Sequence, residues 1–347
     1  MILKKISLHN FRNFDKFNFE LSPEATIIIG KNSKGKTNLL ESIHFIITGT
    51  GFREEKEEEL IGFHKNIMDI NSVFADEKNL LSFQIILDKK NEKTKKTYFD
   101  NKTKRSPSNY KKELPGVVLF TPEQIDIIKG SPSQRRDYFN KIISFFDLEY
   151  KTRLNNYEQA LRKRNKILEK NQRGIYVLEE LDFWNRYLQN EAEYITYKRQ
   201  EYIEYLNTNQ KLDSKLFSIQ YLKNEFTIGL AKQSLEKEIY IRRTIIGPQK
   251  DDFKIMMDDG ENNKNIHFFG SRSEERLAVF WLKINELKYH EEKRKSPILL
   301  LDDIFSELDM DNKNIVLSLI KKYQTVATTT ENGIVNKIKS NKEVINL

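Results

Sequence analysis

The stretch that decides the fold is Gly30-Lys31-Asn32-Ser33-Lys34-Gly35-Lys36-Thr37. It satisfies the pattern Gly-x-x-x-x-Gly-Lys-[Ser/Thr], in which a glycine-rich loop holds phosphate. The residues before it, Thr26–Ile29, are apolar and predict a short buried strand. After it, spacings of three and four predict one buried helical face, made of Leu39, Leu40, Ile43, Ile46 and Ile47. The motif therefore lies between a strand and a helix, as a phosphate-binding loop requires.

Each part of this motif has a chemical task. Glycines at both ends let the backbone turn its N–H groups toward a phosphate, and the following helix adds its positive N-terminal dipole. We expect residues 30–38, with Asn38 as the last, to hold a nucleotide. Lys36 would bridge the β- and γ-phosphates, and the hydroxyl of Thr37 would ligate Mg²⁺. The alternative is a strand-to-helix turn with an incidental lysine.

A second apolar run, Ile298–Leu301, ends in the acidic pair Asp302 and Asp303. The pattern predicts a buried strand that delivers a carboxylate to the metal, and Asp302 is the candidate ligand. Asp303 is the candidate general base that orients and deprotonates water. Its alternative role is to cap a helix. The sequence contains no Asn-Lys-x-Asp string of the kind that reads guanine in GTPases, so we expect ATP.

Composition narrows the class of protein. The 347 residues include no cysteine, which excludes disulfides, thiolate nucleophiles and zinc-cysteine clusters. No run approaches the ~20 apolar residues of a membrane-spanning helix, and charges near the N-terminus argue against a signal peptide. We therefore expect a cytoplasmic protein without a membrane partner. The net charge of +8 weakly favours a polyanionic partner such as nucleic acid.

The pattern along the chain predicts an α/β fold with an inserted helical part. Strands are expected in residues 1–132, at 81–87 and 117–120 among others, with an exposed hairpin around Asp100-Asn101. Residues 133–240 show long helical patterns, and strands return in 241–347, at 298–301 and 325–327. Within the helical part we expect a buried stripe of Phe183, Tyr187, Ala192 and Ile195.

Two further motifs complete a familiar order. Ser271-Arg272-Ser273-Glu274-Glu275-Arg276 opens an amphipathic helix, and Ser306-Glu307-Leu308-Asp309 follows the acidic pair. The succession of phosphate loop, signature serine, paired acids and final aspartate resembles ABC-type ATPases. In that class two heads enclose two nucleotides, and the resemblance implies that Ser271 at a helix N-terminus contacts a phosphate held by a second copy.

Over its whole length the chain resembles the RecF family of bacterial recombination and repair ATPases, relatives of the SMC proteins. The resemblance rests on the order of several short motifs, which are Asn10–Phe14, Thr37–Glu41, Phe120–Gln124, Gly130–Arg136, Trp184, Gly247–Asp252 and Leu301–Asp309. It implies an ABC/SMC-head-like ATPase lobe with an inserted α-helical lobe. It also implies that Gln124, Ser271 and Asp309 contact the nucleotide.

The same resemblance implies a function. Members of the family form ATP-dependent homodimers that bind DNA, either double-stranded, single-stranded or at junctions of the two. They act with RecO and RecR to load RecA at gaps and stalled forks and to induce the SOS response. Hydrolysis would be slow and DNA-dependent, and would serve as a switch. The rival hypotheses are the nucleotide-binding subunit of an ABC transporter and another SMC-like head.

Some residues allow two interpretations. Ser273 stands where the signature has glycine, which adds a side chain near the phosphate. Thr328-Thr329-Thr330 occupies the place of a transporter's switch histidine, so a threonine hydroxyl is expected to sense the γ-phosphate. Arg135 and Arg136 either bind DNA phosphate or form salt bridges between the two lobes, and we favour the second, structural role because paired arginines near a lobe boundary readily meet carboxylates. The basic stretch either contacts DNA or keeps a hairpin soluble; it contains Lys89, Lys90, Lys93, Lys95, Lys96, Lys102, Lys104 and Arg105.

Overall fold

The computed structural model describes residues 1–76, 79–90, 93–170, 175–293, 296–307, 310–330, 333, 338 and 341–347. The chain forms two compact units. The first contains Met1–Glu123 and Glu286–Leu347, and the second contains Gln124–Asn285. We had expected the inserted part to span 133–240, so the second unit is longer at both ends than the sequence pattern indicated.

The first unit contains a five-stranded sheet that carries the phosphate loop. Its strands are, in spatial order, β15 (Lys342–Asn346), β3 (Ala25–Ile29), β14 (Thr325–Thr329), β13 (Ile298–Leu301) and β8 (Val117–Phe120). All neighbouring strands are parallel. Strands β8, β13 and β14 are buried throughout, as expected for a parallel sheet covered on both faces. The strands predicted at 26–29, 117–120, 298–301 and 325–327 are confirmed.

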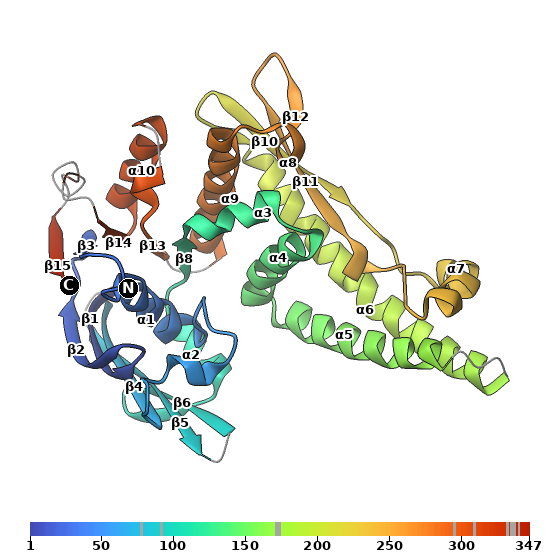
Figure 1. The fold of residues 1–347 in the computed structure, drawn as a ribbon, viewed down its shortest axis with the longest axis horizontal. Helices are drawn as coiled ribbons and strands as arrows, with labels where there is room; N and C mark the ends of the chain where they lie inside the picture. The colour runs from blue at the N-terminus through green and yellow to red at the C-terminus, as the bar shows by residue number, and fades with distance from the viewer. Residues whose placement is uncertain are drawn as a thin grey trace. The chain divides into compact units, whose positions relative to one another are not determined.

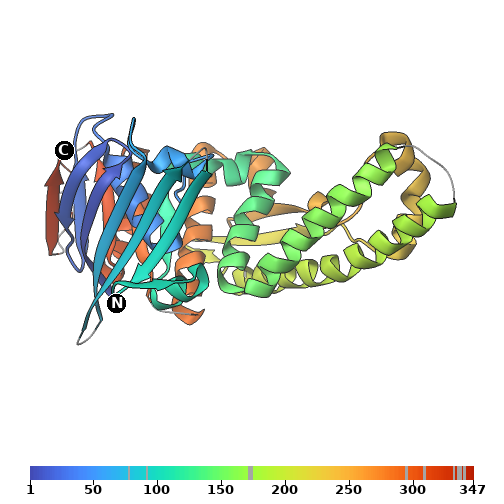
Figure 2. The ribbon, with the colours of Figure 1, turned by 90° about the horizontal axis from the view of Figure 1, so that it is seen from below.

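A six-stranded antiparallel sheet forms the other layer of the first unit (Figure 2). Its order is β2 (Phe14–Glu20), β1 (Ile2–Phe11), β4 (Ile67–Asp76), β5 (Asn79–Lys90), β6 (Lys93–Asp100) and β7 (Thr103–Arg105). The predicted hairpin joins β6 to β7. Its two turn residues, Asn101 and Lys102, have φ angles of 46° and 68°, the positive values that two-residue hairpin turns of type I′ require.

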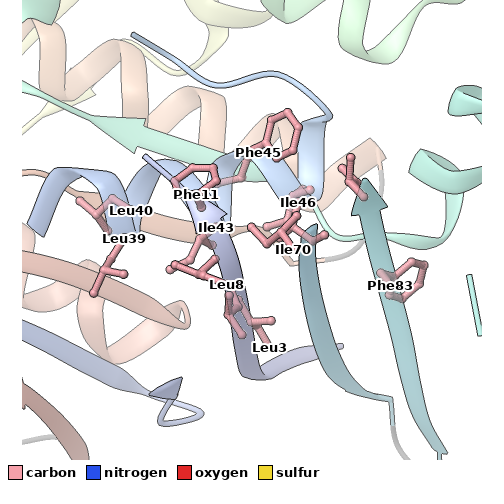
Figure 3. Packing of buried hydrophobic residues seen from close by; sticks show 14 of the residues in the cluster. Leu3, Leu8, Phe11, Leu39, Leu40, Ile43, Phe45, Ile46, Ile70 and Phe83 are labelled. Atoms are coloured by element: carbon pink, nitrogen blue, oxygen red, sulfur yellow. The ribbon is translucent and has the colours of Figure 1, made fainter. Parts of the chain in front are cut away.

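Helix α1 (Lys36–Thr48) contacts both sheets and fills the space between them. Leu39, Leu40, Ile43, Phe45 and Ile46 meet side chains of β1, β4 and β5 in one apolar cluster (Figure 3). Each such side chain contributes about 1.5–3 kcal/mol when it leaves water. The helix begins at the phosphate loop and ends at Gly49, whose φ of 74° closes it with an N–H bond to Phe45 O. This core therefore fixes the position of the loop that precedes it.

Shorter elements complete the first unit. They are the 3₁₀ turn η1 (Glu57–Leu60), α2 (Pro107–Glu113), η4 (Ile304–Glu307) and α10 (Met310–Lys322), together with the C-terminal end of α9 (Arg272–Lys293). Helix α2 begins at Ser106, whose Oγ accepts a hydrogen bond from Asn109 N.

The second unit combines helices with a small sheet (Figure 1). Its helices are α3 (Asp126–Lys129), α4 (Pro132–Phe146), α5 (Leu148–Glu169), α6 (Ile175–Thr208), α7 (Ile228–Ile241), α8 (Ile266–Phe269) and most of α9. Its antiparallel sheet has the order β12 (Asn263–Asn265), β11 (Asp252–Asp258), β10 (Lys215–Leu222) and β9 (Lys211–Leu212). The expectation that 133–240 is wholly helical was wrong, because β10 interrupts it. Since β10 pairs with β11, the residues after 240 pack within this unit.

The predicted stripe on α6 was half wrong. Ala192 and Ile195 are buried, but 59% of Phe183 and 36% of Tyr187 are exposed. The buried face runs instead through Leu181, Leu188, Ala192, Ile195, Tyr202 and Leu206. We predicted Phe183 and Tyr187 to be buried because they are aromatic, but they lie on the exposed side of the helix. None of the described helices is long and apolar enough to span a membrane.

Candidate nucleotide site

The phosphate loop connects β3 to α1 through two unusual backbone positions. Gly35 has a φ of 100°, and Ser33 has a φ of 66°. A Cβ atom on Gly35 would lie 2.8 Å from Asn13 Nδ2 and 2.8 Å from Phe14 Cζ. Glycine is therefore required there both by conformation and by space. Lys31, Asn32, Ser33 and Lys34 are exposed on the loop, while Gly30, Thr37 and Asn38 are half-buried.

The side chain of Lys36 is bound by the loop itself. It is buried, and its Nζ donates hydrogen bonds to Gly30 O at 2.8 Å and to Lys31 O at 3.2 Å. The ammonium group is thus held against the loop backbone, while Lys31, Asn32, Ser33 and Lys34 are exposed. A compact point charge in this position suits the phosphate chain of a nucleotide.

Asp302 meets the phosphate loop although 265 positions separate it from Thr37. The Thr37 hydroxyl donates to Asp302 Oδ1 at 3.1 Å. Burial raises the pKa of Asp302, and hydrogen bonds from Thr328 and Thr37 oppose that rise. A hydroxyl and a carboxylate side by side are hard oxygen donors of the kind that Mg²⁺ takes from proteins. The residues present therefore fit a Mg²⁺ site, as the sequence predicts.

Asp303 stands one residue farther along, immediately before η4. Its φ of 48° is in the left-handed region, and its N–H donates to Thr328 Oγ1 at 2.9 Å. For a residue with a side chain this conformation costs on the order of 1 kcal/mol or more and persists only where neighbours hold it. The general-base and capping roles of Asp303 both stay predictions.

The opening motif Asn10–Phe14 also reaches the phosphate loop, through contacts that the sequence did not predict. Arg12 binds Glu41 of α1 with two hydrogen bonds, at 2.8 and 3.1 Å. Asn13 Oδ1 accepts from Asn38 Nδ2 at 2.7 Å. Glu41 is fully buried, so it needs this cationic partner. The sequence feature that could have indicated this pair is Glu41, an acidic residue among the apolar positions of a predicted helix.

Two predicted nucleotide contacts lie in the second unit. Ser271 is exposed, and it forms a capping box with Glu274 at the start of α9: its N–H donates to Glu274 Oε2 at 2.8 Å, and Glu274 N lies 3.4 Å from its Oγ. Gln124 is half-buried in the 3₁₀ turn η2 (Pro122–Ile125). Their contact with nucleotide remains a prediction. Asp309 lies outside the described residues.

The paired arginines have the structural role that we favoured, contacting carboxylates and backbone, but the expectation that these contacts bridge the two lobes was wrong. Arg135 binds both oxygens of Asp252, at 2.7 and 3.0 Å, and Arg136 donates to Asp251 O at 2.8 Å. All four residues belong to the second unit. These contacts stabilise the junction between α4 and β11.

The basic stretch is partly neutralised by glutamates of residues 54–59. Lys96 pairs with Glu57, and Lys89 pairs with Glu58 at 3.0 Å. Arg105 and Lys90 also have acidic neighbours, Asp100 at 3.4 Å and Asp88 at 3.0 Å. The exposed lysines that remain are Lys93, Lys95, Lys102 and Lys104.

Comparisons with known proteins agree with this geometry. The family model of the RecF/RecN/SMC N terminal domain matches residues 2–346. The DNA replication and repair protein RecF of Natranaerobius thermophilus is 32% identical over 381 aligned positions, covering 100% of this chain and 96% of that protein. RecF of Clostridium botulinum (strain ATCC 19397 / Type A) is 33% identical and covers 95% of this chain and 93% of its own.

Solved structures extend the comparison. A structure of the recombination mediator protein RecF with ATP, in the RecFOR pathway, superposes with a TM-score of 0.82 at 28% identity. The match covers 95% of this chain and 92% of that chain. An SMC head bound to the C-winged helix domain of ScpA has a TM-score of 0.54 at 17% identity, covering 97% and 91% of the two chains. The second likeness concerns the fold alone.

Proposed function

The chain belongs to the RecF family of DNA replication and repair ATPases, and we propose that it is an ATP-gated DNA clamp. In this proposal Mg²⁺-ATP binds at the phosphate loop, two copies associate over the nucleotides, and the dimer binds duplex, single-stranded or junction DNA. RecR, acting with RecO, is the proposed protein partner, and the outcome is loading of RecA. The ABC-transporter alternative is not favoured by these relatives.

The observation that carries the nucleotide part is the contact between Thr37 and Asp302 beside the buried Lys36. Lys36 would neutralise charge on the β- and γ-phosphates, and Thr37 with Asp302 would hold Mg²⁺. The metal supplies charge neutralisation on the phosphate oxygens. Asp303 would orient and deprotonate the attacking water. A carboxylate one methylene shorter than the glutamate of transporters fits slow hydrolysis, so turnover would act as a timer that releases the dimer.

The proposal is tested by fluorescence anisotropy of labelled duplex DNA, titrated with the full chain in Mg²⁺-ATP or in Mg²⁺-ADP. The Lys36→Met variant removes the loop cation, and Lys56→Met removes an exposed lysine of the same unit as a matched control. We expect tight binding only with ATP, in wild type and Lys56→Met alike, and its loss in Lys36→Met. Binding that ignores the nucleotide, or that survives Lys36→Met, would contradict the clamp.

A further inference from the structure

We propose that Thr328 is the residue that positions both acids of the nucleotide site. Thr328 is the fourth residue of β14 and is fully buried. In the sheet, β14 lies between β3, which leads into the phosphate loop, and β13, which leads into Asp302. Ala327 is in register with Leu301, so Thr328 stands opposite Asp302 on the neighbouring strand. The topology thus places a hydroxyl between the two halves of the site.

That hydroxyl makes two hydrogen bonds of opposite sense. It donates to Asp302 Oδ1 at 2.7 Å, and it accepts from Asp303 N at 2.9 Å. A hydroxyl has one proton and two lone pairs, so a single group can serve both partners. A valine of nearly the same shape could serve neither.

The two bonds act on the two acids in different ways. At Asp302 the same oxygen also accepts from Thr37, so two hydroxyls fix the rotamer of the candidate metal ligand. At Asp303 the bond holds the backbone, and with it the left-handed φ of 48°. The direction in which the Asp303 side chain leaves the chain depends on that φ. Thr328 therefore sets the orientation of one acid and the backbone of the other.

This assignment changes the interpretation of the Thr328-Thr329-Thr330 segment. A threonine here was expected to sense the γ-phosphate, but the hydroxyl of Thr328 is directed at the protein's own acids. Thr328 acts on the reaction through Asp302 and Asp303, as a positioning residue. Groups that orient metal ligands in this way affect metal affinity or activity by roughly 10- to 100-fold.

The test compares Thr328→Val, which removes the hydroxyl, with Thr328→Ser, which keeps it. Thr325→Val is the matched control, because Thr325 is equally buried on β14 but its hydroxyl donates to Tyr323 O, outside the site. Three quantities are measured on the full chain. They are binding of a fluorescent ATP analogue in EDTA, the Mg²⁺ concentration at which that binding reaches its Mg²⁺-dependent plateau, and kcat with KM for hydrolysis.

We expect Thr328→Val to bind the analogue in EDTA within about twofold of wild type, because Lys36 is untouched. Its Mg²⁺ midpoint should rise and its kcat should fall, each by roughly 10- to 100-fold. Thr328→Ser should restore both, and Thr325→Val should change neither beyond its effect on stability. Unchanged Mg²⁺ and kcat values in Thr328→Val, or a serine variant as defective as the valine variant, would overturn the assignment. The inference rests on the proposed nucleotide site, whose own failure is seen separately as ATP binding that survives Lys36→Met.

A second inference comes from a different observation, the turn that ends α7. We infer that Tyr240, Ile241, Arg242 and Arg243, called here the α7 turn, contact single-stranded nucleic acid. The Tyr240 side chain is 88% exposed and that of Ile241 is 46% exposed. Both arginines are exposed as well, and in the described part of the chain neither has an acidic side chain within salt-bridge distance.

A buried polar network holds the residues on both sides of the α7 turn. Glu238 pairs with Arg164 of α5 at 2.7 Å, with both side chains fully buried. The other Glu238 oxygen accepts from Ile245 N at 2.9 Å, and Thr244 bonds to Arg164 and Asn165 at 2.7 Å each. A buried ion pair adds little net stability compared with apolar packing. What this network provides is a fixed backbone under an exposed aromatic ring.

The chemistry of the α7 turn favours a nucleic acid strand over a protein. An exposed ring stacks on any unpaired base, and a guanidinium beside it binds phosphate. Arg242 and Arg243, which have no acidic partner among the described residues, add a charge that complements a polyanion. Duplex DNA hides its base faces, so the proposed ligand is a single strand. This inference deepens the proposed function by naming one surface of DNA contact.

The test uses fluorescence anisotropy of a labelled oligothymidylate at two salt concentrations. Tyr240→Ala should weaken binding at least about fivefold, as loss of one stacked base predicts, and Tyr240→Phe should bind within twofold of wild type. Arg243→Ala should reduce the slope of log affinity against log salt concentration by about 0.7. Lys232→Ala, an exposed lysine on the same helix, is the control. Equal binding by Tyr240→Ala and Lys232→Ala would overturn the inference, whereas a wild-type chain that binds no DNA would contradict the proposed function itself.

Discussion

Arg199 and Asp251 form a buried ion pair, 2.5 Å apart, within the second unit. The same arginine donates to Pro248 O at 2.7 Å, and Asp251 also accepts from Tyr221 and from Asn224 N. The Gly247–Asp252 motif, which carried part of the family resemblance, is thus explained by its position. It supplies the acid and the carbonyl that the buried guanidinium on α6 needs.

We expect Asp251→Asn to lower the free energy of unfolding by about 3–5 kcal/mol, because it leaves the Arg199 charge buried without its counter-ion. Urea unfolding followed by circular dichroism measures the change. Glu261→Gln, at an exposed position of the same unit, should stay within about 0.5 kcal/mol of wild type. If Asp251→Asn were as stable as Glu261→Gln, the buried charge of Arg199 would not depend on Asp251 as its counter-ion.

Gly35→Ala tests the conformation of the phosphate loop. The added Cβ atom would lie 2.8 Å from atoms of Asn13 and Phe14. The alanine backbone would also have to adopt a φ of 100°. We expect a loss of ATP-analogue binding and a destabilisation of about 1–3 kcal/mol. Gly260→Ala is the comparison, because Gly260 has a φ of 90° and a Cβ there would have open space. Gly260→Ala should keep full ATP binding and lose only the stability that the strained backbone costs. Equal ATP binding by the two variants would contradict the predicted role of the Gly35 contacts.

The capping box at α9 predicts a specific pH dependence. Burial alone would raise the pKa of Glu274, but hydrogen bonds from Ser271 and Lys264 lower it to about 2, against an ordinary value of 4.5. A carboxylate with a depressed folded-state pKa stabilises the protein above its unfolded pKa. That stability should be lost as the pH falls from about 4.5 toward 2. The difference in unfolding free energy between wild type and Glu274→Gln, measured from pH 6 to pH 2, should shrink across this window; a constant difference would exclude the carboxylate as its source.

The acidic partners of the basic stretch lead to a prediction about DNA. Glu57 and Glu58 cancel the charge of Lys96 and Lys89, so the stretch presents less positive potential than its sequence suggests. We expect the double variant Lys93→Gln/Lys95→Gln to change the affinity for duplex DNA by less than about twofold at physiological salt, where exposed charges are screened beyond about 8 Å. A tenfold loss in the anisotropy titration, with a reduced salt slope, would instead identify this hairpin as a DNA contact.

The geometry of the candidate nucleotide site was predictable because its parts are local patterns whose positions a parallel sheet then fixes. Strands at 26–29 and 298–301 each end in their functional residues, and parallel strands present their carboxyl ends at one edge. The sequence could therefore predict that Thr37 and Asp302 lie close together, as they do, while the nucleotide and metal roles of Lys36, Thr37 and Asp302 stay predictions. The sequence indicated Thr328 only as part of a threonine run, since its contacts with Asp302 and Asp303 depend on which strand lies between β3 and β13.

What the sequence did not predict depends on pairings between distant segments. Residues 241–285 join the second unit because β11 pairs with β10, and no local pattern specifies that register. The pairs Lys96–Glu57 and Arg12–Glu41 join residues 39 and 29 positions apart. On α6, spacing alone could not decide between two neighbouring faces, and aromatic side chains at Phe183 and Tyr187 favoured the wrong one.

The order of strands in the parallel sheet has a consequence for synthesis of the protein on the ribosome. The phosphate loop is translated early, but β13 and β14, which bring Asp302 and Thr328, come after residue 297. Domains fold from the N-terminal side as the chain emerges, so α1 can pack against the antiparallel sheet long before Asp302, the candidate metal ligand, is translated. A nascent or truncated chain that lacks about the last fifty residues would contain the phosphate loop but not Asp302 and Asp303. If the proposed site binds nucleotide, tight Mg²⁺-dependent binding would therefore report that β13 and β14 have been translated and have joined the sheet.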